Sequence, residues 1–480
     1  MNRLYFAMLL AGFMTIVSAV SVVADVAERP STVADRDGVN LTIYNGGTAL
    51  VHDRRRIALT QGLNRIAWRD VSASMDATSA LLEAPAAPAP LHVLEQNFDF
   101  DLLDPSALLQ KYVGREVTIV HEARFPGGHD TREPARILST NGGIVLQYRD
   151  RIETSLRGYI AFPASPANFR DRPTLDLDVD AGKAGTQVLD LSYLTAGLTW
   201  RADYVGVLSP DETKMSLTGL VTLSNTSGES FENAHLQLVA GNVNVAQSTP
   251  DVTSLRAIAR VSSYNGYQPQ GVHQENYFEY HLYSFDRPTT IADKQTKQVT
   301  LLTARDVPVR KTLELRGDAS YYQNGQTDLG QRLPVGIYLS FENRGGDLGV
   351  PLPAGIVRLY KNDRQGLSQF IGSDQLDHTP RNETARLHLG DSFDVTARKR
   401  QTEFQQQGSC STISSYEFVI SNAKPAPQDV SVIEPIPGDW LIIEESAKHF
   451  KSSASAAAWN LRVPANGRST LTYRTLVTWC

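Results

Sequence analysis

Alternation of apolar and polar residues is the main pattern in this chain of 480 residues. Residues 175–180 read Leu-Asp-Leu-Asp-Val-Asp, and residues 471–479 read Leu-Thr-Tyr-Arg-Thr-Leu-Val-Thr-Trp. Strands that bury one face and expose the other read this way, as antiparallel sheets do. The 34 glycines and 24 prolines interrupt these segments at short intervals, which is typical of sandwiches and barrels. The pattern predicts an all-β, multidomain fold of antiparallel sandwiches or barrels.

Few helices are expected, and one segment predicts a helix clearly. Asp104 can cap its start, Pro105 fits the first helical position, and Gly114 ends an apolar stripe that runs from Ala107 to Val113.

Composition places the domain boundaries. Prolines gather at 84–90 and 163–173, alternation stops over 250–276, and Gln405-Gln406-Gln407-Gly408 precedes a final block. The spacing of five expected strands in that block suits an immunoglobulin-like sandwich. The predicted organisation is a signal peptide at 1–24, an N-terminal β domain at 25–95, a helix with a small β domain at 96–165, a central β-sandwich at 166–407 with a loop at 250–276, and an immunoglobulin-like β-sandwich at 408–480.

The first residues have the form of a secretory signal. Arg3 gives a positive start, the run from Leu4 to Val23 carries no charge, and Val22 and Ala24 fit the small-residue positions before a cleavage site. An uncleaved membrane anchor is the alternative. No later apolar run reaches about 18 residues, so no other membrane span is expected. We therefore expect an exported protein.

Charge and cysteine content exclude several classes of protein. The 46 Lys and Arg against 52 Asp and Glu give a net charge of −6, which leaves no basic surplus for nucleic acid. Two cysteines exclude a disulfide-dense scaffold and a zinc site built from cysteines. Cys410 and Cys480 both lie in the final block, and an exported compartment is oxidising, so a disulfide between them is expected. Its geometry depends on a strand order that the sequence does not give.

Several short phrases are more specific than alternation: 193–204, 238–244, 279–283 with Arg287-Pro288-Thr289-Thr290, 351–360 and 389–395. Together they resemble the bacterial envelope family that includes the mucoidy inhibitor A-like proteins. The resemblance covers roughly residues 185–480, and 38–163 more loosely. It implies an all-β protein of the bacterial envelope, periplasmic or secreted, whose C-terminal half is a domain of unknown function, and it supplies no catalytic residues. Some relatives carry a long coiled coil, whereas this chain has no sustained heptads.

Acidic residues suggest a calcium site only at first sight. Asp176, Asp178 and Asp180 resemble the start of a calcium loop, but Ala181 and Gln187 occupy the positions that need Gly and Glu. We interpret the three acids as the solvent face of one strand.

Other candidate groups also favour structural interpretations. His273, Glu275, Glu279 and His281 include too few facing ligands for zinc, so no metal or cofactor is expected. Gly390-Asp391-Ser392 matches the nucleophile block of one lipase and esterase family, yet it lies late in the chain and no Asp-x-x-His follows, which predicts a turn. The basic runs 54–56 and 398–400 are expected on solvated edge strands.

Tyrosines gather between residues 264 and 285. Tyr264 and Tyr267 fall in a segment rich in Gly, Pro and Gln, where core packing is unnatural, so they are the candidate partner-binding residues. The run Tyr277–Phe285 is expected to be one strand. No catalytic motif emerges. The sequence favours an exported non-enzymatic protein that binds an envelope protein or polysaccharide, with a hydrolase acting on an envelope polymer and a structural spacer as alternatives.

Overall fold

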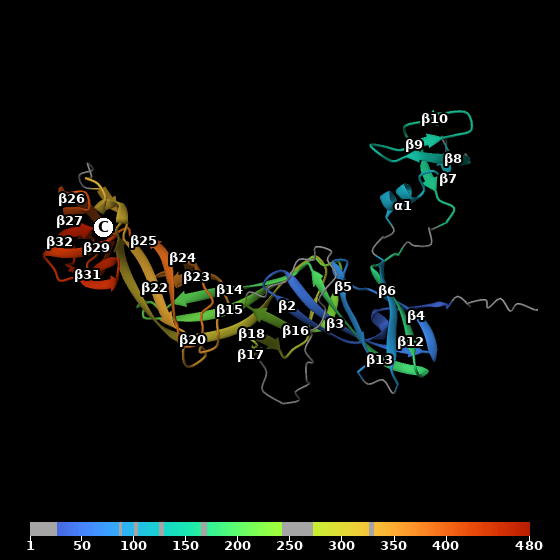
Figure 1. Cartoon of the computed structure of the whole chain (residues 1–480), viewed down its shortest axis with the longest axis horizontal. Coiled ribbons are helices and arrows are strands. Elements are labelled where there is room, and N and C mark those ends of the chain that lie inside the picture. The colour runs from blue at the N-terminus through green and yellow to red at the C-terminus, as the bar shows by residue number, and fades with distance from the viewer. Residues whose placement is uncertain are drawn as a thin grey trace, which may run out of the picture. The chain divides into compact units, whose positions relative to one another are not determined.

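The computed structural model describes residues 26–85, 89–99, 104–123, 129–164, 170–241, 272–325 and 331–480 (Figure 1). The described residues are nearly all β, with 66% strand and 4% helix, so the predicted fold class is confirmed. In the described part the one α-helix is α1 (Pro105–Lys111). Asp104 caps it as expected, because its side chain accepts hydrogen bonds from the N–H groups of Ser106 and Ala107 at 2.8 and 3.0 Å. None of the described helices has the length and apolar character needed to cross a membrane.

The chain forms two compact units. The first comprises the residues up to Asp37, Arg54–Val71 and Leu81–Leu191, and the second comprises Gly38–Asp53, Ser72–Ala80 and Ser192–Cys480. Four strands have residues in both units: β2 (Arg36–Tyr44), β3 (Thr48–Leu59), β5 (Met75–Glu83) and β13 (Gly185–Ala196). The predicted linker at 84–90 joins β5 to β6.

The first unit contains two further sheets. One has the order β1-β4-β12-β6 and the other β10-β9-β8-β7-β11. Their strands are β1 (Glu28–Ser31), β4 (Gly62–Arg69), β6 (Leu91–Asp99), β7 (Glu116–His121), β8 (Thr131–Ser139), β9 (Val145–Gln147), β10 (Ile152–Glu153), β11 (Tyr159–Ala161) and β12 (Thr174–Ala181). The second sheet has a small core of its own, which includes Tyr112, Ile119 and Ile137. A helix and a small β module therefore lie between β6 and β12 in the chain.

The second unit holds the larger sheets. Its first half contains β14 (Leu198–Leu208), β15 (Lys214–Asn225), β16 (Phe231–Ala240), β17 (Val272–Tyr277), β18 (Tyr280–Phe285), β19 (Thr289–Ile291), β23 (Gly355–Asn362) and β24 (Ser368–Leu376). The longest strand, β20 (Gln295–Arg316), pairs with β15 over its first part and with β22 and β28 over its last part. β20 thus continues from the part of the sheet that contains β15 into the part that contains β22 and β28.

The C-terminal end of this unit is a β-sandwich. Its strands are β21 (Gln331–Leu333), β22 (Gly336–Glu342), β25 (Thr384–Asp391), β26 (Val395–Gln407), β27 (Ser411–Asn422), β28 (Gln428–Pro435), β29 (Asp439–Glu445), β30 (Phe450–Ser453), β31 (Ala456–Val463) and β32 (Gly467–Thr478). One core joins Leu313, Val335 and Val395 to Trp459 and Tyr473. The core therefore begins well before the predicted boundary at 407/408, which falls inside the β26–β27 hairpin. The composition break at that boundary marks a hairpin turn rather than a linker. The immunoglobulin-like assignment stays a prediction.

Parallel neighbours are the other departure from the sequence analysis. β14 pairs in parallel with β23, β16 with β2, and β20 with β28. Each of these pairs joins segments far apart in the chain. Alternation within a strand shows which face is buried but not which strand lies beside it, so the sequence did not predict these neighbours.

Candidate functional site

Two of the family phrases meet where β14 and β23 run side by side. Leu198, Trp200 and Tyr204 of the first phrase point into the core, and the Tyr204 hydroxyl donates a 2.8 Å hydrogen bond to the carbonyl oxygen of Pro353. Gly355 lies so close to Ala202 that a Cβ there would clash with the Ala202 carbonyl oxygen. The phrases thus encode the contact between two strands.

The other face of β14 carries a polar network. Asp203, 3% exposed, accepts hydrogen bonds from Thr222 at 2.7 Å, Arg358 at 2.9 Å and Arg201 at 3.1 Å. Gln298 donates to the Thr222 hydroxyl at 3.0 Å, which extends the network across β20, β15, β14 and β23. Burial alone would raise the pKa of Asp203, but these hydrogen bonds outweigh burial and hold it below its usual 3.8.

A third phrase contributes Tyr283 on β18, whose hydroxyl donates to the carbonyl oxygen of Pro351 at 3.0 Å. Burial raises the pKa of Tyr283, so this hydroxyl stays protonated at neutral pH. The Asn343 amide donates to the carbonyl oxygens of Val350 and Thr379 at 2.8 and 3.1 Å, and fixes the same loop. The phrases therefore converge on one scaffold, in which the Tyr204, Tyr283 and Asn343 side chains hydrogen-bond to loop carbonyl oxygens.

A cleft of about 820 Å³ lies in this scaffold, which is within the usual size of a ligand site. Its apolar side chains are Leu236, Val272, Phe285, Val299 and Leu301, and its polar or charged rim includes Asp286, Arg287, Thr289, Lys297, Gln298 and Thr300. The phrase Arg287-Pro288-Thr289 forms part of the lining. The cleft thus brings one of these phrases to the edge of an open space.

One wall of the cleft is a strand edge. Consecutive residues 297–301 of β20 all line it, although alternate side chains of a strand point to opposite faces. Among the described strands, residues 295–308 of β20 pair only with β15. The cleft wall therefore includes residues from both faces of β20, along an edge that has no second partner among the described strands.

The charges at the rim are unequal. The Lys297 ammonium donates to the Thr290 carbonyl oxygen at 2.9 Å, and Arg287 is exposed. Asp286 forms an ion pair with His273, with 3.0 Å between His273 Nε2 and Asp286 Oδ1. The rim thus presents two cations and one carboxylate that already has a partner.

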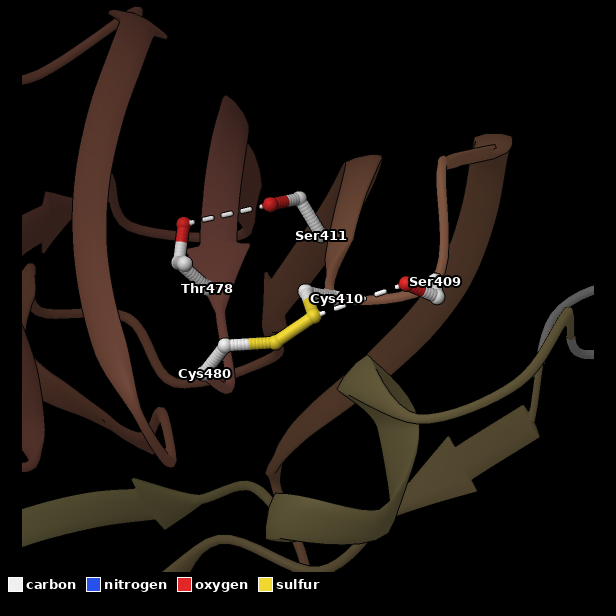
Figure 2. The surroundings of a disulfide bond; sticks show 5 residues. All are labelled: Ser409, Cys410, Ser411, Thr478 and Cys480. Atoms are coloured by element: carbon white, nitrogen blue, oxygen red, sulfur yellow. Dashed lines mark hydrogen bonds between the residues drawn. A yellow bond between two sulfur atoms is a disulfide. The ribbon is translucent and has the colours of Figure 1, made fainter.

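The two cysteines form a disulfide, with their Cα atoms 5.6 Å apart (Figure 2). The bond ties the chain end after β32 to the start of β27, and these two strands are already neighbours in one sheet. Strand pairing therefore supplies the geometry that the sequence could not.

The candidate partner-binding residues Tyr264 and Tyr267 lie outside the described residues.

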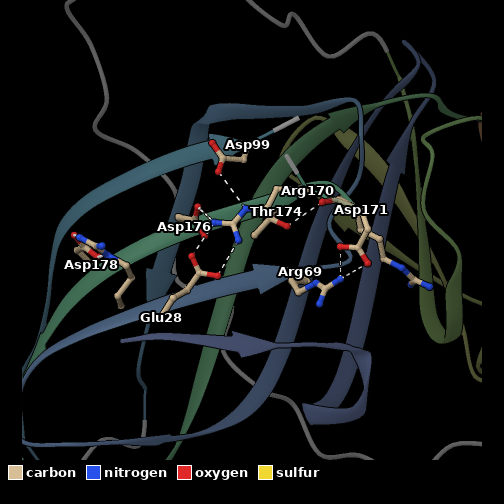
Figure 3. A network of polar contacts seen from close by, with 10 residues as sticks. Glu28, Arg69, Asp99, Arg170, Asp171, Thr174, Asp176 and Asp178 are labelled. Carbon is tan, nitrogen blue, oxygen red and sulfur yellow. Dashed lines mark hydrogen bonds and ion pairs between the residues drawn. The ribbon is translucent and has the colours of Figure 1, made fainter. Parts of the chain in front are cut away.

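The acidic triplet alternates on β12 as expected, with Leu175, Leu177 and Val179 buried between the acids. Arginines engage two of them. Arg170 donates to Asp176 at 2.6 Å (Figure 3), and Arg65 donates to Asp178 at 2.9 Å. Arg170 also pairs with Glu28 and Asp99. Burial raises the pKa of Asp176 to about 6, although Arg170 opposes this shift. Arginine cations occupy the place where a calcium ion would need free carboxylates.

The expectation of one strand over the tyrosine-rich stretch needs correction. Tyr277–Phe285 is a hairpin rather than one strand, because the chain turns at Phe278, where φ is 57°. Glu279 therefore lies in the turn and does not share a strand face with His281. The His281 ring instead contacts Gln274, with 3.0 Å between Nδ1 of His281 and Nε2 of the Gln274 side-chain amide.

The two basic runs are not simply solvated. Arg55 is fully buried and donates to the carbonyl oxygens of Ser31 and Arg69, and Lys399 is 5% exposed. Their neighbours Arg54 and Arg56 form surface ion pairs, so alternation still holds. Edge protection does not explain these runs, because β3 and β26 both lie between other strands of their sheets.

Gly390-Asp391-Ser392 lies where β25 ends. The N–H of Ser392 donates to the Val335 carbonyl oxygen at 2.8 Å, and its hydroxyl accepts from the N–H of Val395 at 3.0 Å. The serine hydroxyl thus stabilises a turn, as the sequence predicts.

A model of the domain of unknown function DUF4139 matches residues 189–480. The chain belongs to the DUF4139 family. No curated protein matches the chain. All the residues that line the cleft, and all the phrases that converge beside it, lie within the DUF4139 domain.

The sequence analysis recognised Arg287-Pro288-Thr289 as part of a family resemblance, but it did not predict that these residues line a cleft. One signal was available: residues 295–301 read Gln-Thr-Lys-Gln-Val-Thr-Leu, with polar residues on both faces of the strand. Such a pattern is typical of an edge rather than of a strand enclosed in a sheet.

Proposed function

We propose that this DUF4139 protein is an exported, non-enzymatic protein of the bacterial envelope, related to the mucoidy inhibitor A-like group, whose cleft binds an extended segment of an envelope protein. The observation that carries the proposal is the open edge of β20 beside an apolar cleft. An added strand gains main-chain hydrogen bonds from such an edge, and its alternate side chains enter the pocket.

The lining favours a polypeptide over a polysaccharide. Sugar sites commonly stack rings against aromatic faces, and Phe285 is the one aromatic residue among the described lining residues. The aliphatic side chains suit apolar residues of a peptide instead. Arg287 and Lys297 suit a segment that also carries carboxylates, since complementary charges set register and partner choice.

Charge reversal tests this proposal. The double variant Arg287→Glu with Lys297→Glu should recover roughly tenfold less partner from an envelope extract, because two attractive contacts become repulsive. The matched control is Lys294→Glu with Arg305→Glu, which changes the net charge equally at exposed positions outside the lining. Equal recovery by both variants would contradict the proposal.

A hydrolase is the second candidate, and the His273–Asp286 ion pair at the rim is the observation that favours it. A histidine oriented by a carboxylate can act as a general base. The change His273→Ala separates the two candidates: binding predicts unchanged partner recovery, whereas a hydrolase predicts loss of turnover of an envelope polymer.

A further inference from the structure

A charged pair lies in the middle of the C-terminal sandwich. Lys399 on β26 and Glu434 on β28 belong to opposite sheets, and 2.7 Å separates Lys399 Nζ from Glu434 Oε2. Lys399 is 5% exposed and Glu434 is fully buried. Burying two charges carries a much larger desolvation penalty than forming an ion pair at the surface, so this pair needs an explanation.

The surroundings of the carboxylate are asymmetric. Oε2 accepts hydrogen bonds from the hydroxyls of Tyr322 at 2.6 Å and Tyr473 at 3.1 Å, in addition to the contact with Lys399. Oε1 is buried and has no hydrogen-bond partner in the described structure. Gly317 lies directly against this oxygen, where a Cβ would clash with it. One oxygen is thus held by three donors and the other by none.

Aromatic rings enclose the amine. Lys399 Nζ lies 3.9, 4.5 and 4.9 Å from the ring centroids of Tyr321, Tyr416 and Phe418. Burial lowers the pKa of Lys399, although Glu434 opposes this shift. The cage therefore excludes water and holds the amine beside the carboxyl group. Transfer of one proton from the ammonium to the carboxylate gives the neutral amine and the carboxylic acid that nucleophilic attack requires.

We propose that Lys399 and Glu434 condense to form an intramolecular amide that links the two sheets. A bond forms between Nζ and Cδ of Glu434, and one carboxylate C–O bond breaks. The departing oxygen takes two of the three ammonium protons and leaves as water, and the third proton stays on the amide nitrogen. No oxidant, metal or other reactant is needed.

Two features favour this reaction. The product is neutral, so the cost of keeping two charges out of water disappears. The hydroxyls of Tyr322 and Tyr473 are aimed at Oε2, where negative charge develops on attack, and burial keeps them protonated by raising the pKa of each. The tyrosines would act as an oxyanion site for a single turnover.

The mass of the purified mature protein tests the proposal. Denatured under non-reducing conditions, the chain should be lighter than its disulfide-linked sequence by the mass of one water molecule. Proteolysis should release a branched peptide that joins the segment containing Lys399 to the segment containing Glu434. A mass equal to that of the disulfide-linked sequence, with no branched peptide, would overturn the proposal, and this result needs no variant.

Two variants sharpen the result. Lys399→Arg keeps the positive charge but removes the primary amine, so the deficit of one water should vanish. Tyr322→Phe removes one donor to Oε2 and should lower the fraction that is cross-linked after a fixed time. A water deficit that persists in Lys399→Arg would place the modification elsewhere and contradict the assignment. The outcome is independent of what the cleft binds.

Discussion

Asp203→Asn is the sharpest test of the polar network that joins four strands of the DUF4139 domain. The substitution keeps the shape of the side chain but removes its charge and replaces one acceptor oxygen with an NH₂ group. If the NH₂ group replaces Oδ2, it faces the donors of Thr222 and Arg201; if it replaces Oδ1, it faces the donor of Arg358. At least one donor is then left without an acceptor, and this is the costly half of breaking a hydrogen bond.

The size of the effect follows from exposure. A buried hydrogen bond to a charged group contributes about 1.5–3 kcal/mol, and the Thr222 bond belongs to this class because Thr222 is 6% exposed. The side chains of Arg201 and Arg358 are 65% and 38% exposed, so solvent screens their ion pairs to about 0.5 kcal/mol each. We expect a loss of about 3 kcal/mol in the free energy of unfolding at neutral pH.

Urea unfolding followed by tryptophan fluorescence measures this loss, with Trp200 in the same strand as a reporter. The midpoint should fall by about 1 M. The control Asp306→Asn removes a carboxylate that is 79% exposed and should change the free energy by less than about 0.5 kcal/mol. Equal midpoints for Asp203→Asn and the control would refute the account of the network.

The same variant has a defined pH dependence. The pKa of Asp203 is lowered in the folded state, so the carboxylate stabilises the fold above its unfolded pKa of 3.8. This contribution is lost as the pH falls from about 3.8 through the folded pKa. The difference between wild type and Asp203→Asn should therefore be full at pH 7 and should shrink below about pH 4. A difference that grows on acidification would reverse the expected sign.

Three further predictions concern other parts of the chain. Gly355→Ala should destabilise the protein by about 3 kcal/mol or more in the same urea assay, because its Cβ meets the Ala202 carbonyl oxygen, whereas the control Gly46→Ala meets no atom within 4 Å and should change little. Replacing both Cys410 and Cys480 with Ser should cost about 4 kcal/mol, since their bond closes a separation of 70 residues; an unchanged midpoint would show that the link is not formed. N-terminal sequencing of exported protein should begin at Asp25, and an intact Met1 on membrane-bound protein would contradict cleavage.

Local features could be predicted from the sequence because they depend on neighbouring residues. The alternation of β12, the Asp104 cap and the turn at Ser392 each follow from a few consecutive side chains. A disulfide between Cys410 and Cys480 was expected because both lie in the final block and an exported compartment is oxidising.

Long-range features were beyond such reasoning. Nothing in β14 or β23 alone shows that they are parallel neighbours, and the cleft exists only because β18 and β20 come together. The burial of Lys399 was not predicted, because residues 398–400 were expected to be solvated on account of their positive charges. Its position gave a signal, since Val395, Ala397 and Lys399 alternate on one buried face. In this fold, the period of a strand is a better guide to burial than residue type.

Site-specific photo-crosslinking from the wall of the cleft tests the central claim most directly. A photoreactive residue in place of Thr300 lies on the cleft lining, and the same residue in place of Thr303 lies on the same strand outside it. In cells that export the protein, the account predicts a discrete, protease-sensitive adduct from position 300, none from position 303, and loss of the adduct in the Arg287→Glu, Lys297→Glu background. Adducts of equal yield from both positions, or an adduct from position 300 that resists protease and survives charge reversal, would contradict the claim that the cleft binds a protein segment.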